Sequence, residues 1–150
     1  MLGKPENGFA RVSLGAFESY ANYIFDTPFD WLKSCKTALQ NKVPLALFID
    51  EGAGNFCYII SFYDTTYVVI HKAEDKDAEL KTINELDFMD ITDMLLRDIE
   101  ADLEEWVRWY AFEDTEEDFA RRRVELRKLL GEVEEALQPE AKRYKKPYAR

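Results

Sequence analysis

The first regular pattern in the chain is an alternation of apolar and polar residues over residues 9–17. Ala10, Val12 and Leu14 would share one face of this segment, and a period of two predicts a β-strand. Residues 18–25 mix aromatic and small side chains. That mixture is compatible with a short helix but has no decisive period.

A helix is predicted from residue 27 to about residue 40. Thr27 is a suitable N-cap, Pro28 fits the first helical position, and Asp30 places an acid in the first turn. Apolar residues then recur with a helical period. Those expected in the core are Trp31, Leu32, Cys35 and Leu39.

Three strand-like runs follow, at residues 45–50, 56–62 and 67–72, separated by short turn-forming segments. Short connections imply antiparallel hairpins, because a parallel pair requires a crossover of about a dozen residues or more. We therefore predict an antiparallel meander. Residues 79–83 are expected to extend it as a fourth strand.

The second half of the chain has a helical period. Leu95, Ile99, Leu103, Trp106 and Tyr110 recur at intervals of three or four residues, which predicts one helix over residues 91–111 with these side chains on its buried face.

A second C-terminal helix is predicted from Thr115, as N-cap, to about Leu137, with Pro139 closing it. Its inward side chains are expected to be Phe119, Leu126, Leu130, Val133 and Leu137.

Together these segments predict one α+β domain, residues 1–139, in which the meander packs with an N-terminal helix and two C-terminal helices. A chain of 150 residues, 47% of them hydrophobic, can bury one substantial core but is short for two domains. Residues 140–150 are basic and lack apolar periodicity. They are predicted to form a disordered tail, which could fold back on an acidic surface.

The net charge of −10 narrows the range of partners. Nucleic acid and anionic membranes bind cationic surfaces, so neither is expected as a direct ligand. No run approaches the ~20 apolar residues of a membrane span, and a cytoplasmic protein is predicted. Cys35 and Cys57 fall in a predicted helix and an apolar strand, where buried free thiols are expected.

Acid is concentrated between Glu85 and Asp118, where fourteen acidic residues stand against only Arg97 and Arg108. Within the predicted helix, helical spacing places Asp98, Asp102, Glu105 and Trp109 in one acidic stripe beside the buried face, and the stripe contains no basic residue. Acid mixed with large aromatics is typical of a surface that binds a basic protein. A solvated charged face is the alternative. The predicted partner-binding residues are Asp98, Asp102, Glu105, Trp109, Phe112, Glu113 and Asp114.

Signals for catalysis are weak. His71 is the only histidine, and neighbouring strands offer no nucleophile in a recognised motif. Asp50 and Glu51 adjoin a glycine-rich turn, so a role in a hairpin explains them more simply than a role as catalytic acids or metal ligands. We expect no enzyme activity, no cofactor and no metal.

Residues 44–58, PLALFIDEGAGNFCY, followed by YVVIH at 67–71, resemble the central strand, glycine-rich turn and next strand of the SUKH superfamily, the Smi/Knr-type proteins. The resemblance covers about 30 residues of the chain. It implies an α+β fold with an antiparallel sheet. It also implies a bacterial immunity protein of a polymorphic toxin system, as many members of that superfamily are.

The function expected from these observations is that of an immunity or inhibitor protein that neutralises a basic effector, with a nuclease as one candidate. Two alternatives remain open: an acidic secretion chaperone that holds an effector segment along the sheet, and a phage anti-defence protein that mimics the charge of nucleic acid. An enzyme using His71 with Asp50 or Glu51 is a third alternative.

Overall fold

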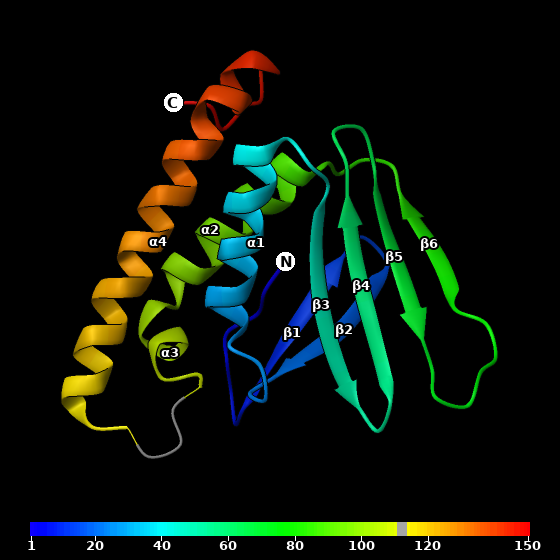
Figure 1. The fold of residues 1–150 in the computed structure, drawn as a ribbon, viewed down its shortest axis with the longest axis horizontal. Coiled ribbons are helices and arrows are strands. Elements are labelled where there is room, and N and C mark those ends of the chain that lie inside the picture. Colours follow the sequence, from blue (N-terminus) through cyan, green and yellow to red (C-terminus); the bar gives the residue numbers. More distant parts are fainter. Residues whose placement is uncertain (111–113) are drawn as a thin grey trace.

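The computed structural model describes residues 1–110 and 114–150, and these residues form an α+β fold with two antiparallel sheets and four helices (Figure 1). The fold class predicted from the sequence is therefore confirmed.

The N-terminal segment is a hairpin of two strands, β1 (Phe9–Leu14) and β2 (Phe17–Asn22). The strand predicted over residues 9–17 ends early, at Leu14, because Gly15 takes a left-handed conformation with φ of 55° and turns the chain. The sequence leaves residues 18–25 ambiguous, with a short helix as one option, and the structure shows a strand there instead. Alternate residues of β2 are buried, which is a strand pattern.

Helix α1 (Thr27–Asn41) lies where the sequence predicts it. Its N-cap is Asp26, and Thr27 is instead the first helical residue. Its core residues are the predicted ones: Trp31, Leu32, Cys35 and Leu39 are all buried.

The main sheet has four antiparallel strands in chain order: β3 (Leu45–Gly52), β4 (Asn55–Ser61), β5 (Thr66–His71) and β6 (Glu79–Ile83). The predicted meander and its fourth strand are confirmed. Its inner face joins one core with residues of β1, β2, α1 and α2. The buried hydrophobic residues of that face are Leu45, Leu47, Ile49, Cys57, Ile59, Val68 and Ile70.

The opposite, outer face of the sheet is open to solvent. Figure 1 shows the hairpin behind this sheet and the helices beside it, and no other described element lies over the outer face. Tyr58 and Leu80 on that face are 40% and 62% exposed, whereas Ile59 and Val68 on the inner face are 0% exposed.

The helix predicted over residues 91–111 is wrong in its extent. Helix α2 (Phe88–Ala101) begins earlier, with Asp87 as a capping-box N-cap. It ends at Asp102, whose φ of −117° and ψ of 37° are not helical, and α3 (Leu103–Val107) follows. The break redirects the next turn, so that Val107 is buried beside Trp106 while Tyr110 is 44% exposed. No glycine or proline near residue 102 signals this break.

Helix α4 (Glu116–Arg143) has the predicted capping box at Thr115 but does not stop at Pro139, which lies inside it. Of the predicted inward residues, Phe119, Leu126, Val133 and Leu137 are buried, and Leu130 is partly buried.

Residues 140–150 also differ from the prediction of a disordered tail. The helix continues to Arg143, and the following segment folds back toward α2, where the ammonium group of Lys146 meets carboxylates. These contacts arise from residues far apart in the sequence, which local composition does not reveal.

Candidate functional site

The predicted acidic stripe lies against the N-terminal segment of the same chain. Asp98 on α2 accepts a hydrogen bond from the backbone N–H of Leu2 at 2.8 Å and pairs with the amino group of Met1 at 2.9 Å. Glu105 on α3 pairs with Lys4 at 2.8 Å. The cations that offset the stripe thus come from the start of the chain, not from the helix itself.

The pair between Lys4 and Glu105 shifts both groups toward their charged forms. The hydrogen bond to Glu105 raises the pKa of Lys4, and Asp102 adds to this through its charge. The same hydrogen bond lowers the pKa of Glu105. Both side chains are solvent-exposed, so the pair orients the N-terminal segment more than it stabilises the fold.

The remaining acids of the predicted site have different surroundings. Asp102 lies between α2 and α3 and has no ion-pair partner among residues 1–110 and 114–150. Asp114 is exposed just before α4. Phe112 and Glu113 lie outside the described residues.

Trp109 is buried, so the prediction that it lies off the buried face is wrong. Its side chain is only 6% exposed, its ring centroid lies 5.1 Å from that of Trp106, and its indole N–H donates to the carbonyl oxygen of Phe25 at 2.9 Å. In this position the indole is part of the core. It does not offer a partner an exposed aromatic anchor.

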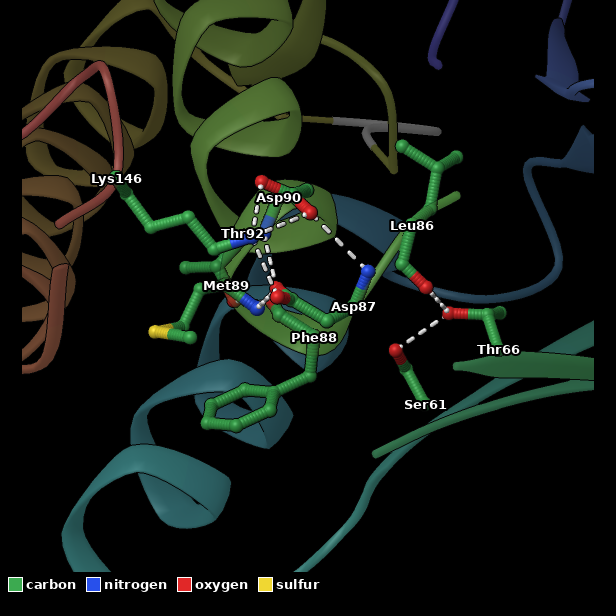
Figure 2. A network of polar contacts seen from close by, with 9 residues as sticks. All are labelled: Ser61, Thr66, Leu86, Asp87, Phe88, Met89, Asp90, Thr92 and Lys146. Atoms are coloured by element: carbon green, nitrogen blue, oxygen red, sulfur yellow. Dashed lines mark hydrogen bonds and ion pairs between the residues drawn. The ribbon is translucent and has the colours of Figure 1, made fainter. Parts of the chain in front are cut away.

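Acids at the start of α2 are paired with the C-terminal segment. Figure 2 shows Lys146 reaching Asp87 at 2.5 Å and Asp90 at 2.9 Å. Burial opposes the charged form of Lys146, but hydrogen bonds to the two carboxylates outweigh it, and the pKa of Lys146 is raised.

The same network joins α2 to the sheet. Asp87 accepts from the backbone N–H groups of Met89 and Asp90 at 2.9 and 3.0 Å, which caps the helix. The hydroxyl of Thr66 donates to the carbonyl oxygen of Leu86 at 2.7 Å and lies 2.6 Å from the hydroxyl of Ser61 (Figure 2). This cluster is structural in character.

A groove of about 570 Å³ lies between α2–α3 and α4. Leucines, including Leu103 and Leu130, contribute its apolar lining, and its acids are Glu100, Glu104, Glu105 and Glu134. Arg127 and Arg150 line it too. Three of the four glutamates already pair with bases of the same chain, Glu104 with Arg123, Glu105 with Lys4 and Glu134 with Arg150. Most of the negative charge on the groove walls is therefore compensated.

Ion pairing across the chain is asymmetric. Most of the 20 lysines and arginines form ion pairs with carboxylates of the same chain. In the described part of the chain, carboxylates without an ion pair outnumber lysines and arginines without one. They include two groups. The helix-side acids are Glu100, Asp102, Asp114, Glu117, Glu125 and Glu135. The sheet-rim acids are Asp30, Asp50, Asp64, Glu74, Asp75 and Asp77.

His71 is not placed to act with either acid considered for catalysis. Its ring stacks on Phe56 at 4.6 Å, and Phe56 lies between it and Asp50 in the strand register. Glu51 points to the inner face, opposite to His71, because successive residues of a strand alternate. Within the described residues, no hydrogen bond joins His71 to a serine or cysteine.

Glu51 instead forms a compact polar cluster. It accepts hydrogen bonds from Lys72 at 2.9 Å, from Ser19 at 2.9 Å and from the thiol of Cys57 at 3.3 Å. Burial favours the neutral acid, but these donors, led by Lys72, outweigh it and lower the pKa of Glu51. Burial, followed by the Glu51 carboxylate, raises the pKa of Cys57 to about 12, so its thiolate is scarcely formed at neutral pH.

The sequence interpretation overlooked the outer face of the sheet. The signal was available: residues 45–49 and 56–60 are apolar at both alternating sets of positions, whereas a half-solvated strand alternates apolar with polar residues. An apolar second set means that both faces of the sheet are apolar, and the structure covers only one.

Comparison with protein-family models, with curated protein sequences and with solved structures found no match. The resemblance to the SUKH superfamily therefore stays a prediction. Among the described residues no group of three or more histidine, cysteine, aspartate or glutamate side chains is arranged to hold a metal ion. None of the helices in that part of the chain combines the length and apolar character needed to cross a bilayer.

Proposed function

We propose that this protein is an acidic, cytoplasmic protein-binding module that neutralises a basic effector, in the manner of an immunity or inhibitor protein. One observation carries the proposal. Most lysines and arginines pair with carboxylates of the same chain, while the helix-side and sheet-rim acids have no ion-pair partner among the described residues.

The physical consequence is a negative surface on which, in the described part of the chain, most cations are already paired. Such a surface attracts a basic protein over about 10 Å at ordinary salt and speeds its association, while it repels nucleic acid and other acidic proteins. Because long-range attraction acts mainly on the association rate, kinetics test the proposal more directly than affinity does.

The experiment uses the product of a neighbouring basic reading frame, or a basic protein recovered from the cell that makes this chain. Association is measured at two salt concentrations. We expect association to slow as the salt concentration rises. It should also slow when charge is reversed in one of the two acid groups, by Glu100→Lys with Asp102→Lys in the helix-side group or by Asp75→Lys with Asp77→Lys in the sheet-rim group.

The matched control is Glu6→Lys with Glu85→Lys, which changes the net charge equally at two exposed acids outside both groups. The control should slow association less than whichever of the two test pairs slows it more. An association rate that changes neither with salt concentration nor in either test pair would contradict the proposal.

A secretion chaperone is a second candidate, and the uncovered outer face of the sheet favours it because a chaperone of this kind holds an effector segment along its sheet. It predicts a stable dimer and preference for an unfolded client. A mass measurement in solution separates the candidates, since the inhibitor proposal does not require a dimer.

A further inference from the structure

The outer face of the main sheet is built from continuous rows of apolar side chains. The strand register places Phe48, Tyr58, Val69 and Leu80 side by side across all four strands. The next row runs through Ala46, Ile60, Tyr67 and Thr82. In a solvated antiparallel sheet these positions are ordinarily polar.

Aromatic rings on this face are already packed against each other. The ring centroid of Phe48 lies 5.1 Å from that of Tyr58 and 5.4 Å from that of Phe25. Phe56 and His71 extend the cluster, with their rings stacked at 4.6 Å. A partner that meets this surface therefore finds a largely pre-organised set of rings, which reduces the entropy lost on binding.

Without a partner to cover it, exposure of this apolar surface to water is unfavourable. Large contiguous apolar patches on a soluble chain mark interaction sites. Phe62, 39% exposed, and Leu80, 62% exposed, continue the surface to its margins. The composition of the face matches that of an interface centre, where aromatic residues contribute most of the binding energy.

Carboxylates surround this face. Asp50 lies in the same row as Phe56 and His71, and Asp30 lines a small pocket with Ala46 and Phe48. The other sheet-rim acids occupy the turns after β4 and β5. Of the bases in the turn after β5, Lys72 is bound to Glu51, which leaves Lys76 as the base of that turn without an ion pair in the described part of the chain.

The negative charge of this rim distinguishes between two possible partners, a second copy of the chain and a basic protein. Two copies of the chain, each with net charge −10 and the same acidic rim, would repel each other face to face. A partner with an apolar centre and lysines or arginines around it would satisfy both the rings and the carboxylates.

We propose that the outer face of the main sheet is the docking surface for the basic partner, and that this partner presents an apolar patch bordered by lysine and arginine. The proposal rests on the proposed function for the sign of the partner's charge. It goes further in locating the contact on the sheet, away from the helix-side acids and the groove.

The test uses a short synthetic peptide in which lysine alternates with valine and phenylalanine. Two twins serve as comparisons, one with glutamate in place of lysine and one with serine in place of the apolar residues. Backbone amide signals of the isotope-labelled protein are followed during titration. We expect the basic apolar peptide to shift signals of Phe48, Tyr58 and Val69, the serine twin to shift them less, and the glutamate twin to leave them unchanged.

A double variant, Tyr58→Ser with Val69→Thr, should lose these shifts at the highest peptide concentration. Tyr20→Ser removes an aromatic that is 58% exposed on β2, outside the face, and should retain them. Unchanged signals from α2 and α4 show that each variant is folded.

Each other outcome overturns the inference in a recognisable way. Shifts at Glu100 and Asp102 instead of the sheet would leave the proposed function standing and remove the docking surface. Equal binding of the glutamate twin would contradict the stated chemistry of the partner. Absence of binding by all three peptides would remove the docking surface, while the proposed function would still be decided by the association kinetics of the natural partner. Dimerisation through Tyr58 and Val69 would make a second copy the occupant.

Discussion

The indole N–H of Trp109 donates to the backbone carbonyl oxygen of Phe25 at 2.9 Å, which fixes the end of the α2–α3 region to the loop before α1. The contact joins residues that are 84 positions apart in the sequence. It also explains why a tryptophan lies on a helix segment otherwise rich in acids: the ring belongs to the core.

Trp109 should accordingly be important for stability. Replacement by alanine removes a buried aromatic ring and should lower the free energy of unfolding by about 3–5 kcal/mol. Trp109→Phe keeps most of the ring and loses the hydrogen bond, so about 1–2 kcal/mol is expected. Urea unfolding of both variants measures the difference. An alanine variant as stable as the wild type would restore the surface position that helix spacing predicts.

Lys146 should hold the C-terminal segment in place. Lys146→Met leaves the carboxylates of Asp87 and Asp90 without their shared cation, and a loss of about 2 kcal/mol is expected in thermal or urea unfolding. Lys145→Met is the matched control, because Lys145 is exposed and forms no ion pair in the described part of the chain. If the segment were disordered, the two variants would be equally stable.

Glu51 should make stability depend on pH. Its pKa is lowered in the folded chain from an ordinary value of 4.5, so its contribution is present above about pH 4.5 and is lost as pH falls through the folded-state pKa. Glu51→Gln should therefore be less stable than the wild type at pH 7, with the difference shrinking under acid conditions. Unfolding midpoints at several pH values measure this.

The control for that experiment is Glu125→Gln, at an exposed carboxylate on α4 without an ion pair among the described residues. Its stability relative to the wild type should change little with pH. A constant difference for Glu51→Gln would show that its hydrogen bonds do not depend on the charge of the carboxylate.

Both thiols should be free and unreactive in the folded protein. Cys35 and Cys57 are buried, and burial is the main cause that raises the pKa of each to about 12. A thiol reagent at pH 8 should modify them only after unfolding. Intact mass should be the same before and after reduction, whereas a gain of two protons would indicate a disulfide.

Much of the fold follows from local patterns in the sequence. The short turns between β3, β4 and β5 imply the meander, and Pro28 marks the start of α1. The boundaries that failed depend on tertiary contacts. The chain breaks at Asp102 without a local signal, and α4 continues through Pro139 because the surrounding packing outweighs the lost backbone hydrogen bond.

The candidate site was harder to predict for the same reason. Helical spacing correctly groups Asp98 and Glu105, but it cannot show that Met1 and Lys4 pair with them. Conversely, the apolar outer positions of β4 and β5 were visible in the sequence. The sequence does not show whether a helix covers these positions, and in the structure no described helix lies over that face of the sheet.

The distribution of ion pairs has a consequence for synthesis of the chain. Asp87, Asp90 and Glu104 leave the ribosome before Arg123 and Lys146, the bases that pair with them. The growing chain therefore carries uncompensated negative charge around α2 until α4 and the segment after it have been made. Docking of α4 and the segment after it is then a late step, which pairs these three carboxylates and completes the core together.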